Sequence, residues 1–225
     1  MIPSNDFVAR RFFSSDNAAS YDKIVRYTTF GRDSIWKRNM SKLLTKDQCH
    51  LLDLACGTGI FSYYIPKGRD QIIIGSDLTL DFLSYAKRKT RYSLLTNSVA
   101  EFLPFRPGVF DAILSSYLAK YVDLRTVVRE HWRLLKNQGL VVFHDFTPPK
   151  GEFVRQIWNS YFQLLRQMGR IIKTWRIVFS ELDDVIVKSE WVKKLLKELQ
   201  RAGFESINCK YYTWGTSAIV TGLKP

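Results

Sequence analysis

The feature that most constrains this chain is a short apolar run that leads into a turn with almost no side chains. Residues 50–54 read His-Leu-Leu-Asp-Leu, and residues 55–59 read Ala-Cys-Gly-Thr-Gly before a second apolar stretch begins. This pattern is typical of a strand, a tight turn and the first turn of a helix. Glycines leave the backbone of the turn bare, so a ligand can lie directly against its N–H groups.

The turn and the acid in front of it narrow the class of ligand. The turn has neither the Lys-Ser/Thr of a nucleotide-triphosphate loop nor the Gly-x-Gly-x-x-Gly of a dinucleotide fold. Asp53, just before the turn, suits a ligand with a positive amine or hydroxyls better than one with phosphates. S-adenosylmethionine (SAM) has both an ammonium group and a ribose. A glycine turn also occurs where a helix simply packs closely on a strand, so this feature alone leaves both interpretations open.

A second acid ends the next apolar run. Residues 71–77 read Gln-Ile-Ile-Ile-Gly-Ser-Asp, as in a buried parallel strand, and Asp77 lies 18 residues (77 − 59) after Gly59. An acid about 20 residues after the glycines binds a ribose diol in nucleotide-binding folds, because a carboxylate accepts both hydroxyl protons. Asp77 as the cap of a following helix is the alternative. The turn and the acid together favour a nucleoside ligand.

The rest of the chain alternates strand and helix patterns. Helical patterns are expected over a leader at 1–46 broken at Gly31, at 60–66, 80–91 and 123–135, in an insertion at 150–187, and at 189–202 with Gly203 as the C-cap. Strands are expected at 50–54, 71–77, 92–96, 110–116 and 140–146, with an antiparallel edge at 206–212 and 217–223. We therefore predict one α/β domain over 1–225, a Rossmann-like, doubly wound seven-stranded sheet with ligands at the carboxyl ends of its strands. The leader either covers the ligands as a lid or packs on the sheet.

The net charge of +13 fits nucleic acid, an anionic membrane surface, an acidic substrate or simply a well-solvated surface. No apolar run approaches the length of a membrane span, and residues 1–6 lack a signal-peptide pattern. The cysteines at 49, 56 and 209 are not spaced as metal ligands, so no metal site is predicted. A reduced, cytoplasmic setting is expected.

Together these motifs resemble the class I SAM-dependent methyltransferases, and more narrowly the UbiE-like family that C-methylates the quinone ring in menaquinone and ubiquinone biosynthesis. The resemblance runs from Tyr21 to the C-terminus. It is carried by Tyr21-Asp22, Thr29-Phe30-Gly31, Trp36 and the segments 51–59, 100–105, 110–113, 132–136, 202–204 and 222–225. It implies SAM as cofactor, S-adenosyl-L-homocysteine as product and a polyprenyl quinol as acceptor.

The family's cofactor contacts fall here on Thr58, Asp77, Val99, Ala100 and Ser116. Val99 departs from the family, which often has a polar side chain able to contact the adenine amine there. With the glycine turn and its flanking residues included, the predicted cofactor-binding residues are Asp53, Ala55, Gly57, Thr58, Gly59, Asp77, Leu78, Val99, Ala100 and Ser116.

The acceptor side departs further from the family. Where the family usually has Arg-Asn-Val after the fourth strand, this chain has Lys120-Tyr121-Val122, and the family's leader Asn is Val25. Methylation of a quinol carbon requires alignment with the methyl group and a group that takes or polarises a ring hydroxyl proton. The catalytic candidates are Tyr21, Lys120, Tyr121 and Asp145, with His144 beside them. Lys120 is the candidate for stabilising a phenolate. A structural role is the alternative for each.

The insertion adds a hypothesis about membranes. Apolar residues recur at helical spacing at 154, 157, 158, 161, 165, 168 and 172, and residues 151–180 hold five basic side chains against one acid. The basic residues are Arg155, Arg166, Arg170, Lys173 and Arg176. Aromatic residues beside arginines suit an anionic membrane interface, which predicts peripheral contact with the inner face of the membrane. An amphipathic helix packed on the sheet is the alternative.

Three acceptors stay open: a polyprenyl quinol, another small or lipid molecule such as an amine headgroup or a phenol, and RNA. The RNA-type tetrapeptide Asn/Asp-Pro-Pro-Tyr/Phe is missing after the fourth strand, where Ser115-Ser116-Tyr117-Leu118 stands, so no nucleic-acid partner is expected. The intact turn and Asp77 disfavour a non-catalytic scaffold. A monomer and a homodimer are both compatible with the sequence.

Overall fold

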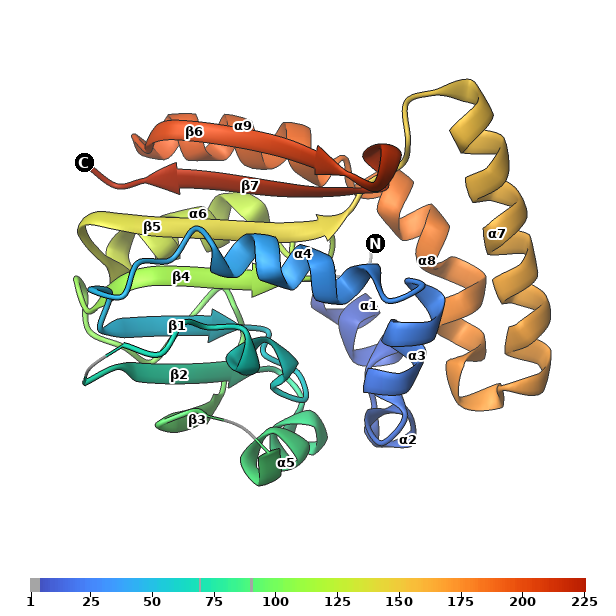
Figure 1. Ribbon diagram of the computed structural model, residues 1–225, viewed down its shortest axis with the longest axis horizontal. Helices are drawn as coiled ribbons and strands as arrows, with labels where there is room; N and C mark the ends of the chain where they lie inside the picture. Colours follow the sequence, from blue (N-terminus) through green and yellow to red (C-terminus); the bar gives the residue numbers. More distant parts are fainter. Residues whose placement is uncertain (1–4, 69, 90) are drawn as a thin grey trace.

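The seven strands of the computed structural model form one sheet in the order β3-β2-β1-β4-β5-β7-β6 (Figure 1). Residues 5–68, 70–89 and 91–225 are described. The strands are β1 His50–Leu54, β2 Ile72–Asp77, β3 Leu94–Asn97, β4 Phe110–Ser116, β5 Leu135–Phe146, β6 Glu205–Tyr212 and β7 Ser217–Leu223. Strands β1 to β5 are parallel, whereas β7 runs antiparallel to β5 and β6. The predicted doubly wound, seven-stranded fold is confirmed.

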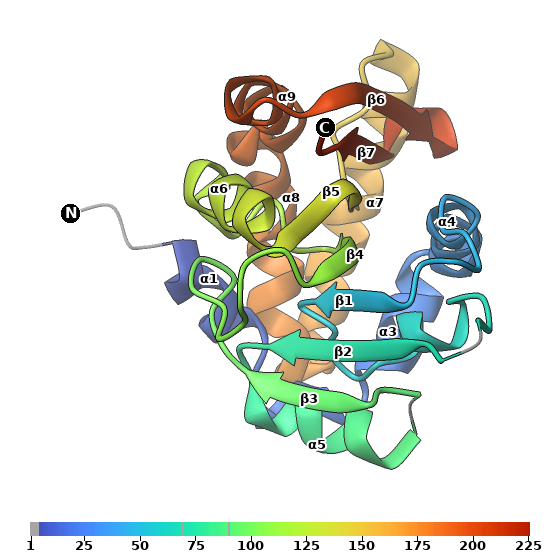
Figure 2. The ribbon, with the colours of Figure 1, turned by 90° about the vertical axis from the view of Figure 1, so that its left-hand side faces the viewer.

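Helices cover both faces of this sheet and extend beyond the carboxyl ends of the strands (Figure 2). The leader contains α1 Asn5–Phe12, α2 Ser15–Ala18, α3 Tyr21–Thr28 and α4 Arg32–Ser41. The others are α5 Leu80–Lys89, α6 Leu124–Leu134, α7 Glu152–Ile171, α8 Arg176–Ser189 and α9 Trp191–Ala202, with short 3₁₀ turns at η1 Ile60–Tyr63, η2 Lys173–Trp175 and η3 Thr213–Gly215. Residues 1–4 of the predicted leader and residue 90 of the predicted helix at 80–91 lie outside the described residues.

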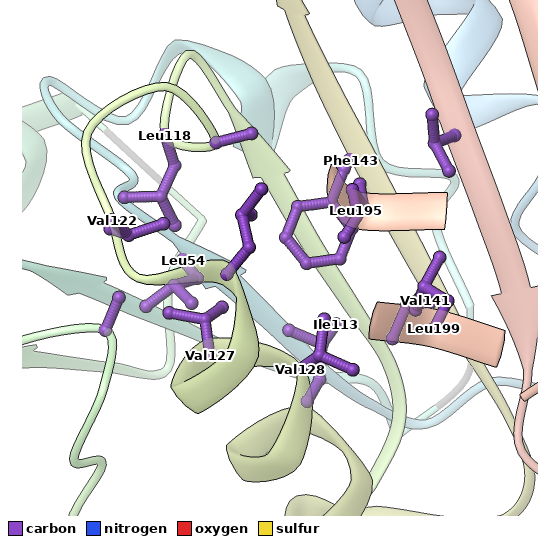
Figure 3. Packing of buried hydrophobic residues seen from close by; sticks show 14 of the residues in the cluster. Leu54, Ile113, Leu118, Val122, Val127, Val128, Val141, Phe143, Leu195 and Leu199 are labelled. Carbon is purple, nitrogen blue, oxygen red and sulfur yellow. The ribbon is translucent and has the colours of Figure 1, made fainter. Parts of the chain in front are cut away.

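The main core lies between the sheet and helices α6 and α9 (Figure 3). Helix α6 begins at the N-cap Asp123, whose carboxylate accepts a hydrogen bond from the Thr126 N–H. Its buried side chains recur at 124, 127, 128, 131 and 134, the spacing of one helical face. Val127 and Val128 pack with Ile113 of β4 and Phe143 of β5. This core holds β4 and β5 in place, and both strands end at the site.

A third hydrophobic cluster forms beyond the strand ends, where α7 and α8 make a hairpin against the leader (Figure 1). Phe12 of α1 is buried with Phe162 of α7 and with Trp175 and Phe179 from the second half of the hairpin. The two helices approach closely at Gly169, where an added Cβ would lie 3.2 Å from the Cα of Arg176. The insertion and the leader also form opposite walls of a cavity, which is described below.

Several predicted boundaries were wrong for local reasons. The helix expected at 60–66 is only the 3₁₀ turn η1, with i→i+3 bonds from the Ser62 N–H to Gly59 O and from the Tyr64 N–H to Phe61 O. Strand β5 begins at 135 instead of 140, since Gln138 adopts a positive φ of 61° and its N–H bonds to Lys224 O. The break at Gly31 is confirmed, with φ at 72° between α3 and α4.

Candidate active site

The glycine turn after β1 adopts a backbone that few residues tolerate. Ala55, Gly57 and Gly59 have φ values of 57°, 55° and 82°. A Cβ added to Gly57 would meet only Phe82, at 3.7 Å, so glycine is required there by conformation and not by space. The turn is anchored by the Cys56 N–H, which donates to Ser76 O at 3.0 Å. The result is a rigid loop with exposed backbone at the carboxyl ends of β1 and β2.

Asp77 ends β2 directly against this turn. Its carboxylate accepts hydrogen bonds from the Gly57 N–H at 2.8 Å and from the Thr79 N–H at 2.9 Å. Burial raises its pKa, while these two backbone donors act in the opposite direction. Asp77 also lines the cavity beside the turn. A carboxylate that lines the cavity at this place is of the right type to accept the hydroxyls of a ribose.

A first cavity follows the carboxyl edge of the sheet from the turn to β4, and seven of the predicted cofactor residues line it. They are Ala55, Gly57, Asp77, Leu78, Val99, Ala100 and Ser116. Ser98 also lines this cavity, and its Oγ lies 2.7 Å from Ser76 Oγ. Since Val99 has no polar side-chain atom, polar contact with a base on this side falls to Ser98 and to backbone groups. The residues that line this cavity fit a nucleoside whose base carries one small polar group.

Three predicted cofactor residues do not line this cavity. Asp53 is buried, because its side chain alternates to the other side of β1 from the cavity-lining Leu54, and there it accepts a hydrogen bond from the Tyr92 hydroxyl. Thr58 is buried as well, and its hydroxyl donates to Asp22 Oδ1 of α3 at 2.5 Å. Gly59 lies behind the turn as the start of η1. Neither the Asp53 nor the Thr58 side chain lines the cavity, and Thr58 ties the leader to the turn.

A second cavity of about 430 Å³ lies next to the first and shares Phe13, Tyr21, Tyr117 and Tyr121 with it. Its walls come from α3, α4, β5, the α7–α8 hairpin and η3. Most of the lining side chains are aromatic or aliphatic, among them Trp36, Phe146, Trp158, Tyr161, Phe162, Trp175 and Phe179. A chamber of this kind admits a large, flat, apolar molecule and excludes water.

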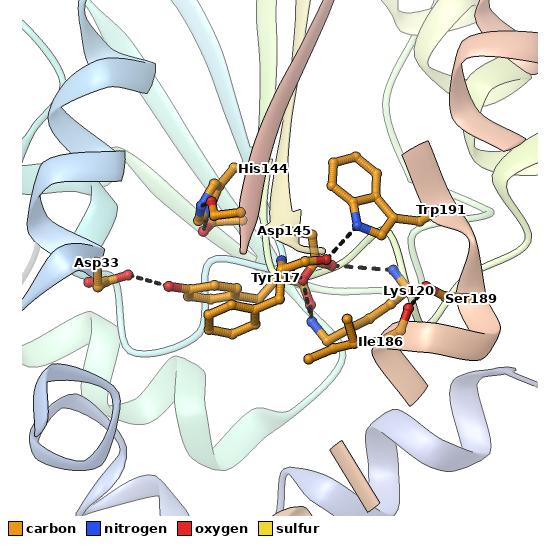
Figure 4. Close-up of polar contacts among 11 residues, drawn as sticks. Asp33, Tyr117, Lys120, His144, Asp145, Ile186, Ser189 and Trp191 are labelled. Atoms are coloured by element: carbon orange, nitrogen blue, oxygen red, sulfur yellow. Dashed lines mark hydrogen bonds and ion pairs between the residues drawn. The ribbon is translucent and has the colours of Figure 1, made fainter. Parts of the chain in front are cut away.

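One buried cation lines this second cavity. The Lys120 Nζ donates to Asp145 Oδ1 at 2.6 Å and to Tyr117 O at 3.1 Å (Figure 4). It also lies over three aromatic rings, 4.3 Å from the ring centre of Tyr121, 5.5 Å from that of Tyr117 and 5.7 Å from that of Phe146. Burial lowers the pKa of Lys120, and Asp145 acts in the opposite direction. The cation is fixed by its carboxylate and directed at an aromatic wall.

Asp145, the carboxylate behind Lys120, is one of the predicted catalytic residues. Asp145 lines neither cavity and is fully buried, because β5 turns this side chain inward toward Lys120. Its two oxygens accept from the Lys120 Nζ and from the N–H groups of Phe146 and Lys120. Because Asp145 is buried and lines neither cavity, its observed role is to hold Lys120.

The two tyrosines of the prediction do lie where the cavities meet. Tyr21 of α3 packs edge-to-face with Phe82, and its ring lies 6.0 Å from that of Trp175. Burial raises the pKa of Tyr21 and of Tyr121, and nearby carboxylates add to the effect, Asp33 first for Tyr21 and Asp145 for Tyr121. Both hydroxyls therefore stay protonated at neutral pH and act as donors.

His144 is a structural residue. Its Nδ1 lies 2.8 Å from Ser116 Oγ and its Nε2 lies 2.9 Å from Ser217 Oγ, and the ring is fully buried. Burial lowers its pKa well below the ordinary value, and the charges of Lys37 and Lys120 add to this. The neutral ring bridges β4 to β7 and orients Ser116 on the wall of the first cavity.

Sequence reasoning missed Tyr117 and its polar partners. Tyr117 has a positive φ of 68° at the end of β4, and its ring stacks on Phe146 at 4.8 Å. Its hydroxyl donates to Asp33 Oδ1 at 2.8 Å (Figure 4). Asp33 in turn pairs with the buried Lys37 one helical turn away. The one signal in the sequence for these partners is the spacing of Asp33 and Lys37 at i and i+4. An acid and a lysine at this spacing ordinarily form a pair on the surface of a helix.

Comparison with known proteins agrees with this geometry. The model of the ubiE/COQ5 methyltransferase family matches residues 4–224. The ubiquinone/menaquinone biosynthesis C-methyltransferase UbiE of Shewanella frigidimarina is 30% identical, over 97% of this chain and 91% of its own. The demethylmenaquinone methyltransferase of Lactiplantibacillus plantarum is 24% identical, over 92% of each chain. In fold, the chain is similar to the crystal structure of a SAM-dependent methyltransferase from Archaeoglobus fulgidus, with a TM-score of 0.64 at 13% identity over 91% of this chain and 100% of that one. The chain thus belongs to the ubiE/COQ5 methyltransferase family and is a SAM-dependent methyltransferase.

Proposed function

We propose that this methyltransferase transfers a methyl group to a ring carbon of a reduced polyprenyl quinol. The observation that supports this most is the aromatic cavity with a single buried cation, joined to the first cavity by four shared aromatic side chains. A quinol has a flat ring, a long apolar tail and acidic hydroxyls, and these three properties match the shape, lining and charge of the chamber. An RNA acceptor would find few polar partners in this chamber.

The residues of the first cavity fit the cofactor. Asp77 would accept the ribose hydroxyls, and the backbone of Ala55 and Gly57 would lie against the methionyl part. Ser98 and the backbone of Val99 and Ala100 would face the adenine. When bound, SAM supplies an electrophilic methyl group on a sulfonium.

Lys120 is the residue that would activate the acceptor. Its fixed positive charge stabilises a quinol hydroxyl as the phenolate, which raises electron density at the neighbouring ring carbon. That carbon forms the bond to the methyl group while the bond from methyl to sulfur breaks, and loss of the ring proton with protonation of the oxygen restores the phenol. The hydroxyl proton released at the start is the net proton lost, and it passes to solvent at the open side of the cavity because Lys120, Tyr21 and Tyr121 are already protonated. The hydroxyls of Tyr21 and Tyr121 are donors that orient the ring, and the aromatic walls exclude water.

The setting that goes with this acceptor is the inner surface of a membrane. A polyprenyl quinol resides in the bilayer, so the enzyme would act as a cytoplasmic protein in peripheral contact with lipid. None of the helices in the described part of the chain is both long and apolar enough to cross a bilayer. The high net positive charge supports attraction to an anionic lipid surface.

The test is transfer of labelled methyl from SAM to demethylmenaquinol and to demethoxy- and methoxy-benzoquinols, each with and without dithionite. Product is expected only with the reductant, because an oxidised quinone lacks the electron density for attack on the methyl group. Methylation of an amine lipid, another phenol or RNA, together with no activity on any quinol, would overturn the proposal and leave the methyltransferase assignment standing.

A further inference from the structure

The mouth of the second cavity, which we propose holds the acceptor, carries large apolar side chains that face solvent. Phe30 at the end of α3, Trp214 in η3 and Ile157 on α7 all line the cavity, and they are 80%, 79% and 53% exposed. We call these three the mouth residues. Phe153, one turn before Ile157 on the same face of α7, is also exposed. The cavity therefore opens through an apolar rim contributed by three segments far apart in the sequence.

The rim is held rigidly. Phe30 and Trp214 have φ values of 50° and 54°, a left-handed backbone that bulky residues rarely adopt. Each is held by neighbours: the Gly31 N–H bonds to Arg26 O at 2.8 Å, and the Trp36 Nε1 donates to the Thr213 hydroxyl at 3.1 Å. The Phe30 ring also lies 5.9 Å from that of Tyr161 on α7. A backbone of this kind persists only where the surrounding structure enforces it, and here it displays two aromatic side chains.

The three segments that form the rim are positively charged. Residues 23–32, 148–157 and 208–216 contain six basic side chains and one acidic one, Glu152. The basic residues are Lys23, Arg26, Arg32, Lys150, Arg155 and Lys210, and all six are exposed. Aromatic tips surrounded by cations complement the interface of an anionic bilayer, in which the rings reach the acyl boundary and the cations stay with the headgroups.

We propose that the mouth residues dock on an anionic lipid bilayer, so that the acceptor passes from the membrane into the cavity without crossing water. The identity of the acceptor in this proposal rests on the proposed function. The proposal places the lipid-facing surface away from the cluster of Arg166, Arg170 and Lys173, which are three of the five basic residues behind the sequence-based membrane hypothesis. That cluster lies toward the other end of α7, where Ile171 is about 21 Å along the helix from Ile157, and Arg166 pairs there with Asp183.

The experiment is sedimentation of the full chain with vesicles of phosphatidylcholine alone and of phosphatidylcholine with 30% phosphatidylglycerol at low salt. The wild type is expected to bind the anionic vesicles and to be released as salt rises. The double variant Phe30→Ser/Trp214→Ser should bind these vesicles about tenfold or more weakly, because each of its two substitutions removes one aromatic side chain that would be buried in the bilayer. Two matched controls should bind like the wild type: Ile171→Ser, an 84% exposed residue at the far end of α7, and Arg166→Gln/Arg170→Gln/Lys173→Gln.

A second readout locates Trp214 directly. Lipids brominated in the acyl chain should quench part of the tryptophan fluorescence of the wild type, and Trp214→Phe should lose that part while still binding. Unchanged binding of Phe30→Ser/Trp214→Ser, or an equal loss in the Ile171→Ser or triple-glutamine control, would overturn the proposal. Vesicle binding needs no turnover. Binding without quinol methylation would therefore refute only the acceptor, and quinol methylation without binding would refute only the docking surface.

Discussion

The Nζ of Lys120 lies 2.6 Å from Oδ1 of Asp145, and the two side chains are 1% and 0% exposed. Two charges removed from water this completely are tolerated because each neutralises the other and both make further hydrogen bonds. Lys120 sits after β4 and Asp145 near the end of β5, so the pair exists only because these strands are neighbours in the sheet. The sequence predicted both residues as catalytic candidates. In the structure the Lys120 cation lines the cavity and the Asp145 carboxylate lies behind it.

Removal of the cation alone should damage both stability and turnover. Lys120→Met leaves the Asp145 carboxylate buried without its counter-ion, which should lower the free energy of unfolding by about 3–5 kcal/mol. Lys120→Met/Asp145→Asn removes both charges of this pair and should regain most of that loss in urea unfolding. Turnover of quinol should stay roughly 10²–10³-fold low in both variants, as for the loss of one electrostatic stabiliser. Recovery of turnover in the double variant would reduce the pair to a structural role.

Asp77→Ala should weaken cofactor binding. Loss of the carboxylate removes the acceptors for the ribose and leaves the Gly57 and Thr79 N–H groups without their partner. Affinity for S-adenosylhomocysteine should fall by about 1–3 kcal/mol in isothermal titration. Thermal unfolding of the same variant is the control for folding. Equal affinity in a folded protein would show that Asp77 serves only to cap the turn and α5.

Two glycines that differ in their surroundings should respond differently to alanine. Gly57→Ala has room for its Cβ but forces a non-glycine residue to a φ of 55°, which costs about 1–2 kcal/mol and distorts the ligand-facing turn. In Gly75→Ala the Cβ would lie 2.7 Å from Leu95 Cδ2, the tip of a flexible side chain that can move, so the overpacking costs about 1 kcal/mol, the low end of the usual range. Both variants should unfold at lower urea concentration, and Gly57→Ala should show the larger loss of S-adenosylhomocysteine affinity. The reverse order of affinity losses would count against the turn as the ligand-facing element.

Asp53 should give the protein a measurable pH dependence. Burial raises the pKa of Asp53 to about 7, against about 3.9 in the unfolded chain. The folded state therefore holds a proton that the unfolded state releases, so this contribution to stability is complete below pH 4 and is lost as pH rises through about 7. The loss amounts to up to roughly 4 kcal/mol.

Asp53→Asn isolates this effect, because the amide oxygen still accepts from the Tyr92 hydroxyl but does not titrate. The difference in unfolding free energy between wild type and Asp53→Asn should fall between pH 4 and 7. Comparing the two proteins cancels other groups, such as His131, whose burial lowers its pKa to about 4 and acts in the opposite direction. A flat difference across that window would show that Asp53 is ionised in the folded protein.

The sequence by itself determined the architecture and predicted most of the residues that line the first cavity. Residues 50–59 and 71–77 each combine a strand pattern with the residue that ends it, and such patterns depend on interactions within a few positions. The bounds of β1 and β4 agree with prediction to the residue, and Asp77 lies against the glycine turn, as its spacing from that turn indicated. Parallel strands bring their carboxyl ends to one edge, so this half of the site follows from local order alone.

The tertiary structure alone decided which polar groups line the second cavity. A strand pattern shows that the side chains of β5 alternate, but it does not show that Asp145 would be covered by Lys120 or that Asp53 would turn away to Tyr92. The aromatic residues of the insertion and leader read as core, membrane or ligand contacts equally well until the hairpin closes on α3 and α4. These outcomes depend on contacts between residues 25 to more than 100 positions apart, such as Lys120 with Asp145 and Tyr161 with Thr28. Their energies are set by packing and burial, which no local pattern of residues encodes.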